Sequence, residues 1–308
     1  TLSELGDDLD LMKPNQNLYT LTSDIITNLK PVLEEFTPDY VYVHGDTTTT
    51  MASSIAAFYA GAKVCHVEAG LRTFDMQSPF PEEMNRSVTG VVSNYHFSPT
   101  ETSKENLLRE NKKENSILVT GNTVIDALLF SVNKIKSSSF IDDEVVELQK
   151  LIDDHKKVIL VTGHRRENHG QGFLNICAAL KEIAKNHPES QIIYPVHLNP
   201  NVQKPVYDLL AGIDNIKLIA PLSYPAFVWL MEKSYLIITD SGGVQEEACI
   251  LHTPCLTIRN NTERPETVNV GANIICGYKS KDILKFSNRM IKRKRKWKIP
   301  LGNGKTSK

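Results

Sequence analysis

Short apolar runs rich in β-branched residues alternate with stretches of helical spacing along almost the whole chain of 308 residues. The apolar runs have the length of buried strands, and the stretches between them are long enough for helices of several turns. Such alternation predicts βαβ units and parallel sheets. The expected strands are residues 40–45, 63–67, 94–97, 116–120, 157–162, 191–196, 215–220, 235–239, 254–258 and 273–276. The expected helices are residues 20–35, 49–60, 83–92, 100–110, 122–135, 173–187, 224–233, 243–251 and 280–296.

The pattern weakens between Lys134 and Lys157, where a polar segment holds no strand. A domain hinge is therefore expected before or within this segment. A single sheet would need ten or more strands, which open sheets rarely reach. We therefore predict an α/β protein with two Rossmann-like domains facing across a cleft. The expected domains are residues 1–121 and 122–297, with residues 298–308 returning to the first.

Three carboxylates occupy positions where a parallel sheet presents ligands. Asp46 and Glu68 each close a short apolar run, and Glu82 follows on the next loop. In open α/β sheets, ligands bind at the carboxyl ends of the strands. The three acids therefore suggest acid/base chemistry on a polar substrate. Asp46 could instead only cap the following helix, and Glu82 could form a first-turn charge pattern with Arg86.

The second half of the chain supplies parts of an anion site. The strand 158–162 is followed by His164, Arg165 and Arg166, which precede a helix. Cations at this place can hold phosphate together with free main-chain N–H groups. A second connection between a strand and a helix has the same arrangement, because strand 236–240 leads into Ser241-Gly-Gly and a helix.

Ser241 can cap that helix, and Gly242 and Gly243 let its first turn approach a phosphate closely. Glu247 lies about a turn and a half further on, within reach of ribose hydroxyls. These positions indicate a nucleoside-diphosphate site. No Gly-x-Gly-x-x-Gly or Gly-x-x-x-x-Gly-Lys-Thr loop is present, which argues against nicotinamide and P-loop chemistry. The histidines and acids fit no standard metal motif, and His44, His66, His96 and His197 are expected to be structural.

Composition narrows the picture further. The chain is 41% hydrophobic and 23% charged with a formal net charge of −1, so it gives no general reason to expect a nucleic-acid partner. Its five scattered cysteines are typical of reduced core thiols in a cytoplasmic protein. No apolar run is long enough for a membrane helix, and no signal peptide is visible, so no membrane partner is expected. The basic run 292–298 is interpreted as the solvated end of a helix.

The ordered set of motifs is far more specific than its parts. The motifs are His-Gly-Asp-Thr-Thr-Thr-Thr, His-Val-Glu-Ala-Gly-Leu-Arg-Thr, Pro-Phe-Pro-Glu-Glu-x-Asn-Arg, His-Phe-Ser-Pro-Thr-Glu-Thr-Ser, Thr-Gly-Asn-Thr-Val-Ile-Asp, Gly-His-Arg-Arg-Glu-Asn, Pro-Val-His-Leu-Asn-Pro, Thr-Asp-Ser-Gly-Gly-Val-Gln-Glu-Glu and Thr-Glu-Arg-Pro-Glu. In this order, from about Leu9 to Thr306, they resemble the bacterial non-hydrolysing UDP-N-acetylglucosamine 2-epimerase family.

The resemblance implies the two-Rossmann-domain fold of many glycosyltransferases (GT-B-like), a homodimer, and no redox cofactor or metal. It implies interconversion of UDP-N-acetylglucosamine and UDP-N-acetylmannosamine through loss and re-addition of UDP, for cell-surface polysaccharide precursors. Catalytic roles carry over to Asp46, Glu68, Glu82 and His164. Substrate-binding roles carry over to Arg86, Arg165, Phe227, Ser241, Gly242, Gly243, Glu247 and Arg264.

The ends of the chain depart from the family pattern. Family members begin with a strand carrying Gly-Thr-Arg-Pro-Glu, which does not occur here. We therefore expect an incomplete N-terminal domain that lacks a βαβ unit of about 30 residues and is poorly stable. The alternatives left open are a hydrolysing epimerase that releases N-acetylmannosamine and UDP, a glycosyltransferase, and an inactive nucleotide-sugar-binding fragment.

Overall fold

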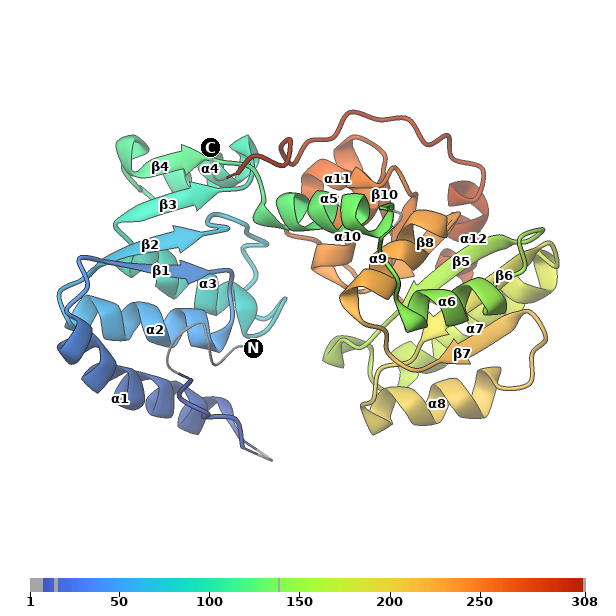
Figure 1. Cartoon of the computed structure of the whole chain (residues 1–308), viewed down its shortest axis with the longest axis horizontal. Coiled ribbons are helices and arrows are strands. Elements are labelled where there is room, and N and C mark those ends of the chain that lie inside the picture. The colour runs from blue at the N-terminus through green and yellow to red at the C-terminus, as the bar shows by residue number, and fades with distance from the viewer. Residues whose placement is uncertain (1–7, 14–15, 138, 307–308) are drawn as a thin grey trace. The chain divides into compact units, whose positions relative to one another are not determined.

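The computed structural model describes residues 8–13, 16–137 and 139–306, and the chain divides into two compact units (Figure 1). One unit ends at Asn122 and takes in the C-terminal residues from Thr306, and the other is Thr123–Lys305. All strand pairs are parallel. The predicted α/β class is therefore confirmed, and each of the ten predicted strands is present with ends that differ by one residue at most.

The first unit holds a four-stranded sheet in the order β1-β2-β3-β4. Its strands are β1 (Tyr40–His44), β2 (Lys63–Val67), β3 (Tyr95–Ser98) and β4 (Ile117–Val119). Its helices are α1 (Leu18–Phe36), α2 (Thr48–Tyr59), α3 (Glu82–Val92), α4 (Glu101–Arg109) and the short η2 (Glu114–Ser116). Buried apolar clusters in this unit are small, and Tyr40 and Tyr42 on the edge strand β1 are 47% and 67% exposed.

The second unit holds a six-stranded sheet in the order β10-β9-β8-β5-β6-β7. Its strands are β5 (Lys157–Thr162), β6 (Ser190–Pro195), β7 (Ile216–Ile219), β8 (Leu236–Thr239), β9 (Cys255–Thr257) and β10 (Asn273–Ile275). Its helices are α5 (Thr123–Ile135), α6 (Asp143–Leu151), η3 (Arg166–Asn168), α7 (Gln171–Asn186), α8 (Pro200–Leu210), α9 (Tyr224–Lys233), α10 (Gly242–Ile250), α11 (Pro265–Asn269) and α12 (Ser280–Met290).

Strand order in the second unit reverses between β5 and β8. The chain winds outward from β5 to β7 on one side, then returns to β8 and winds outward to β10 on the other. Ligands of open α/β sheets bind at such a switch point, outside the carboxyl ends of the two strands. In the first unit the described strands follow one another in sequence, so they contain no such reversal.

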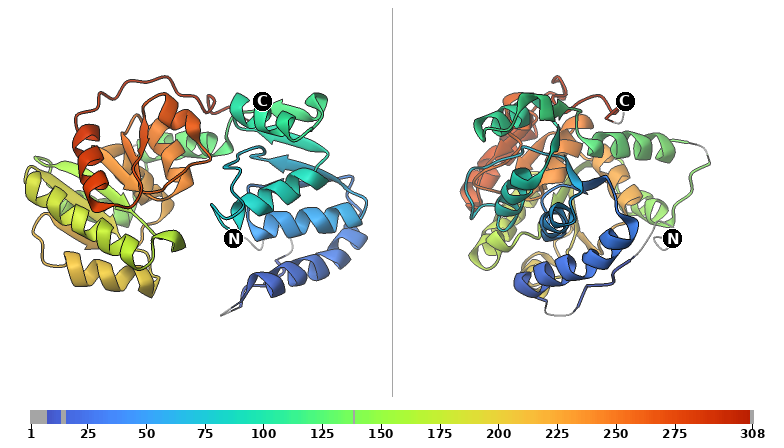
Figure 2. Two further views of the ribbon diagram at one scale, coloured as in Figure 1. Left: turned by 180° about the vertical axis from the view of Figure 1, so that it is seen from behind. Right: turned by 90° about the vertical axis from the view of Figure 1, so that its left-hand side faces the viewer.

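Alternate residues of the central strands enter two separate cores of the second unit. Ile159 and Val161 pack with residues of α7, α8 and α12, a layer that Figure 2 shows from behind. Val158 and Leu160 pack with residues of α5, α6, α9 and α10. Both faces of this sheet are therefore covered, as parallel sheets require.

Three α-helices of the described residues were not predicted from the sequence. α6 lies in the polar segment, α8 contains Pro200 and Pro205, and α11 has only five residues. Proline and high polarity both disguise the helical repeat. Among the described residues, no helix is long and apolar enough to cross a membrane.

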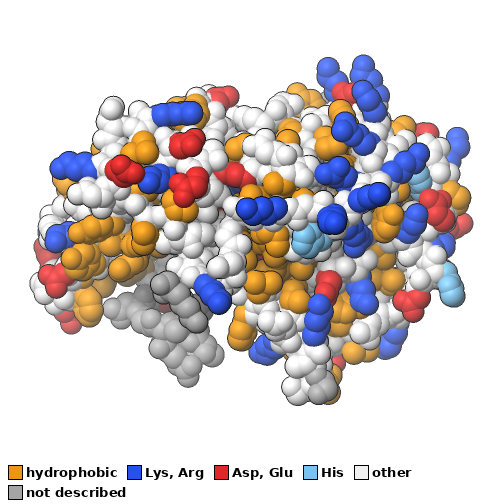
Figure 3. All heavy atoms as spheres, turned by 90° about the horizontal axis from the view of Figure 1, so that it is seen from above, with side chains coloured by type: hydrophobic (Ala, Val, Ile, Leu, Met, Phe, Trp, Pro, Cys, Tyr) orange, Lys and Arg blue, Asp and Glu red, His pale blue; other side chains and the backbone are white. Residues whose placement is uncertain are grey.

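The basic run does not form a helix end as predicted, because α12 ends at Met290. Residues 292–298 instead form an extended strap, and Figure 3 shows many exposed Lys and Arg side chains in its right-hand half. Arg293 donates to the carbonyl oxygen of Gly271, Arg295 to that of Ser234 and Trp297 to that of Cys249, at 3.1, 2.7 and 2.9 Å. These carbonyls lie at or near the ends of α11, α9 and α10, so the strap serves as a shared C-terminal cap.

Candidate functional site

The acids at the ends of β1 and β2 meet at a buried arginine. The guanidinium Nη2 of Arg86, on α3, lies 2.6 Å from Asp46 Oδ2 and 3.2 Å from Glu68 Oε2. Its Nη1 also donates to the main-chain oxygen of Glu68. The Arg86 side chain is 2% exposed, whereas those of Asp46 and Glu68 are 25% and 16% exposed. The two carboxylates thus stay reachable from solvent while one cation beneath them fixes both.

Local backbone geometry supports this cluster. Gly45 has φ +77°, and a Cβ there would lie 3.3 Å from Glu68 Oε2. Glu68 itself has φ +66°, an uncommon conformation for a residue other than glycine. Such strain collects at functional sites, where the surrounding structure maintains it. Asn85 adds a hydrogen bond of 2.9 Å from its amide to the main-chain oxygen of Asp46.

Asp46 does not cap α2. The N-cap residue is Thr47, whose hydroxyl accepts from the main-chain N–H of Thr50 at 3.2 Å. The capping interpretation of Asp46 is therefore wrong, and its carboxylate points instead to Arg86.

Two neighbouring glutamates on α3 have different environments. Glu83 is 4% exposed and accepts from the main-chain N–H groups of Thr73 and Phe74 at 3.0 and 2.9 Å. It therefore anchors the preceding loop. Glu82 is only half-buried and lies one turn before Arg86, on the same face of the helix.

His66 supports the acid cluster from within the sheet. Its Nε2 lies 2.8 Å from the main-chain oxygen of Gly45, and burial together with Arg86 lowers its pKa to about 3. His96 is also buried, and burial lowers its pKa to about 4. Both fit the predicted structural role. His44 and His197 are exposed, and His197 Nδ1 accepts from the main-chain N–H of Asn199 at 3.1 Å.

The second unit has a candidate site of its own, at the switch point between β5 and β8. Asp240, which follows β8, is fully buried. Its Oδ2 accepts from the main-chain N–H groups of His164 and Arg165 and from the Asn168 amide, each at 3.0 Å. Asp240 thus ties the loop after β5 to β8. The prediction missed this residue, although an acid closing a buried strand was the signal that identified Asp46.

His164 is not a permanent cation. Burial lowers its pKa, although Asp240, 3.6 Å away, opposes the shift. The ring is therefore largely neutral at pH 7. It stacks on His197 with 5.5 Å between ring centroids, a contact that sequence reasoning missed. The side chain of Arg166 lies outside the described residues.

The first turn of α10 leaves space where a ligand would approach. Ser241 is the N-cap residue, but its side chain makes no capping hydrogen bond. A Cβ at Gly242 would lie 2.5 Å from Nη1 of Arg264, so a larger residue there would displace the Arg264 guanidinium. A Cβ at Gly243 would meet no protein atom within 4 Å. Open space above a helix N-terminus is where main-chain N–H groups bind anions.

Further along α10, Glu247 accepts from the hydroxyl of Tyr224 at 2.8 Å. Burial raises the pKa of Glu247, and this hydrogen bond opposes the shift. Phe227 lies on α9 with Tyr224 and is half-buried. Tyr224 was not predicted as a site residue.

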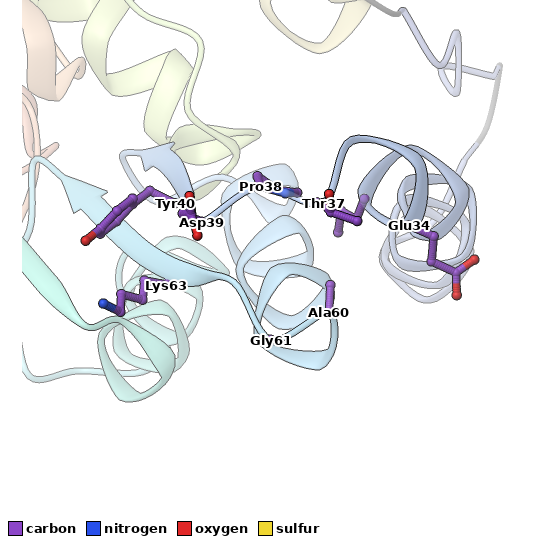
Figure 4. Close-up of a pocket in the computed structure, with 9 residues that line it drawn as sticks. Glu34, Thr37, Pro38, Asp39, Tyr40, Ala60, Gly61 and Lys63 are labelled. Carbon is purple, nitrogen blue, oxygen red and sulfur yellow. The ribbon is translucent and has the colours of Figure 1, made fainter.

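One cavity lies elsewhere. It has a volume of about 780 Å³ and is lined by the loops before β1 and β2, including Thr37, Asp39 and Gly61 (Figure 4). These loops are at the amino ends of the strands, opposite Asp46 and Glu68. Cavity size therefore does not locate the acid cluster, which stands on a different edge of the sheet.

The sequence model of the family described as UDP-N-acetylglucosamine 2-epimerase matches residues 4–308. The chain belongs to this family. It is 54% identical over 284 residues to the UDP-N-acetylglucosamine 2-epimerase of Yersinia pestis, covering 92% of this chain and 76% of that protein. The protein of the same name from Escherichia coli K12 is 53% identical over 285 residues, with the same coverage.

Solved structures agree with the family assignment. The epimerase from Neisseria meningitidis bound to UDP-N-acetylglucosamine is 48% identical with a TM-score of 0.93, covering 97% of this chain and 82% of that one. A Staphylococcus aureus protein solved with UDP is 39% identical with a TM-score of 0.88, covering 96% and 79%. The predicted GT-B-like fold class is thereby confirmed.

Proposed function

We propose that the chain catalyses reversible epimerisation at C2 of UDP-N-acetylglucosamine to give UDP-N-acetylmannosamine. Family membership supports the enzyme class, and relatives have been solved with UDP-N-acetylglucosamine and with UDP. The observation that carries the proposal is the pair of accessible carboxylates, Asp46 and Glu68, fixed by Arg86 at adjacent strand ends.

The chemistry explains why more than one acid is needed. The C2 hydrogen of the sugar is not α to a carbonyl, so direct removal is too difficult. If the C1–O bond breaks first, UDP leaves with the bonding electrons and C1 becomes cationic, which makes the C2 hydrogen acidic. A carboxylate then takes that proton and a 2-acetamidoglucal forms. A second acid protonates C2 from the opposite face, and UDP adds back at C1.

Asp46, Glu68 and Glu82 supply these acids. Main-chain N–H groups at Gly242 and Gly243, with His164 and Arg165, hold the departing diphosphate so that it can return. Glu247 faces the ribose, and Phe227 lies beside the base. Arg86 acts from beneath the acids, in the sugar and phosphate region.

We also propose a cytoplasmic homodimer that supplies polysaccharide precursors. All five cysteines are free and buried, as expected for a protein kept in reducing conditions. The dimer is suggested by family resemblance alone, and light scattering after size exclusion measures it directly.

Incubation with UDP-N-acetylglucosamine in deuterated water tests the proposal. Deuterium at C2 of recovered UDP-sugar is expected, together with appearance of the manno epimer. Free N-acetylmannosamine and UDP would identify a hydrolysing enzyme instead. UDP binding without C2 exchange would identify a binding protein and overturn the proposal.

Asp46→Asn and Glu68→Gln should each reduce the exchange rate by about a hundredfold or more, because each removes a group that acts on protons or charge. Asp39→Asn is the matched control, since Asp39 is exposed at the other end of β1. A loss below about tenfold in both site variants would assign these acids to structure.

A further inference from the structure

A series of ion pairs with alternating charges lies beneath the anion site of the second unit. Glu167 Oε1 lies 3.4 Å from Arg259 Nε, and Arg259 Nη1 lies 3.1 Å from Glu263 Oε2. The other oxygen of Glu263 accepts from Arg264 Nη1, and Arg264 Nε donates to Glu246 Oε1 at 2.8 Å. This series of ion pairs thus joins the loop after β5 to α10, the two elements that flank the switch point.

Most of these charged side chains are buried. Glu263, Arg264, Arg259 and Glu246 are 6%, 7%, 1% and 1% exposed. Buried charges are tolerated only when they compensate one another. Burial opposes ionisation of Glu263, but Arg264 and Arg259 outweigh it and hold its pKa at about 2. The carboxylate therefore stays charged at every pH at which the protein would work.

The two arginines are held differently. Arg264 is fixed by two hydrogen bonds, whereas Arg259 contacts its carboxylates at ion-pair distance without hydrogen-bond geometry in the described structure. Arg264 also lies directly against Gly242, where its Nη1 occupies the place of a side chain. Glu263 contacts both guanidinium groups, and its Oε1 would lie 3.1 Å from a Cβ at this glycine.

We propose that Glu263 is a positioning residue for the nucleotide site: it sets the guanidinium of Arg264 against Gly242 and is itself set by Arg259. The inference rests on the proposed function, in which the diphosphate lies at the start of α10. Glu263 acts through Arg264 and touches no ligand. Its role is to keep one cation at the place where the phosphates arrive.

The Glu263→Gln variant tests this role. The amide can still accept from Arg264, but its NH₂ group faces Arg259 as donor against donor, so the link is broken on one side. We expect affinity for UDP to fall about tenfold, the scale of one charge-assisted hydrogen bond. Affinity for uridine, which lacks the diphosphate, should stay within about twofold. Calorimetry measures the first, and nuclear magnetic resonance titration measures the second.

A matched control separates positioning from general destabilisation. Gln191 is 3% exposed at the amino end of β6, where its amide bonds Leu151 and Asp153 at 3.0 and 3.1 Å. Gln191→Ala should lower the melting temperature without changing the ratio of UDP to uridine affinity. Because Glu263→Gln removes the buried carboxylate beside Arg259 and leaves it the partly exposed Glu167, the double variant Arg259→Met/Glu263→Gln provides a form without that buried charge. It should also bind UDP about tenfold more weakly than the wild type.

The inference would be overturned if Glu263→Gln or the double variant bound UDP as tightly as the wild type. It would also be overturned if the variants lost affinity for UDP and for uridine equally. Tighter UDP binding by Glu263→Gln would show that Glu263 only reduces the positive potential, which also overturns it. Absence of UDP binding by the wild type would instead refute the proposed function. The two failures are therefore distinguishable.

Discussion

At the scale of single residues, Arg86 resolves a problem created by the acids. Two carboxylates at neighbouring strand ends repel each other unless a cation lies between them. The guanidinium is nearly inaccessible to solvent and contacts both, so attraction is exerted at short range and with little screening. The acids are thereby kept as a pair at a fixed separation, which an acid/base mechanism on two faces of a sugar requires.

Buried histidines in the first unit predict sensitivity to acid. The pKa values of His66 and His96 are lowered to about 3 and about 4, below the ordinary value near 6.5 in an unfolded chain. As pH falls below about 6.5, the unfolded state takes up protons that the folded state does not, so stability decreases toward pH 4. At pH 5 each histidine should cost about 2 kcal/mol.

His96→Gln should therefore lose less stability between pH 7.5 and pH 5 than the wild type, by about 2 kcal/mol. Urea unfolding at the two pH values measures the difference. The exposed His155→Gln is the control and should follow the wild type. A pH dependence of His96→Gln equal to that of the wild type would contradict the prediction.

His164 predicts that substrate binding takes up a proton. Burial holds its pKa below the ordinary value in the ligand-free protein, and a bound diphosphate should raise it. Affinity should therefore increase as pH falls from the bound pKa to the free pKa, and be flat outside that window. UDP-N-acetylglucosamine is the suitable ligand, because its diester phosphates do not titrate near neutral pH.

Calorimetry in buffers of different ionisation enthalpy measures this uptake, in an Asp46→Asn background that prevents turnover. His164→Gln should abolish it, and His155→Gln should retain it. Equal proton uptake by His164→Gln and the parent would assign the proton to another group.

At the scale of elements, the strap of residues 292–298 explains an otherwise puzzling basic run. Arg293 and Arg295 donate to carbonyls at or near the ends of helices. Lys292, Lys294 and Lys296 alternate with them in sequence, and all five residues are exposed. The arginines therefore hold the strap through these hydrogen bonds.

Arg295→Gln should destabilise the second unit by about 1–2 kcal/mol, because it removes a charged donor from the carbonyl oxygen of Ser234 and a cation from above the Tyr235 ring. The neighbouring Lys294→Gln removes the same charge from an exposed side chain and should change stability by less than about 0.5 kcal/mol. Urea unfolding compares the two. Equal effects would mean that only the net charge of the strap matters.

At the scale of the whole molecule, the two units differ in how much they bury. The second has a core on each face of its sheet, while the described part of the first has only small clusters and exposed aromatic residues on β1. Stability follows buried apolar area, so the first unit should unfold at lower temperature.

Scanning calorimetry should thus show two transitions. UDP at about 100 times its dissociation constant should raise only the upper one, by about 5 °C or more, since ligand binding to the folded form stabilises the unit that binds it. Limited proteolysis during heating identifies which unit opens first. A single transition, or an equal shift of both, would contradict this assignment.

Local patterns in the sequence were enough to predict the strands, most helices and the candidate acids, because burial on a sheet requires a characteristic alternation within each run of residues. It also placed the candidate anion groups after β5 and β8, since a strand followed by Gly-His-Arg or Ser-Gly-Gly is a local signal.

Which of these groups meet could not be predicted from such local patterns. Arg86 lies 40 residues from Asp46 in sequence, and Asp240 lies 76 residues from His164. Such pairs depend on strand order and on where the order reverses, which no local pattern encodes. Tertiary structure likewise gives Glu82 and Glu83, which are neighbours in sequence, different environments. It also explains why the series of ion pairs through Glu263 could not be predicted. The burial of each helix and strand produces a local pattern that the sequence shows directly. Which residues become neighbours across a sheet depends on the strand order, which local patterns do not contain.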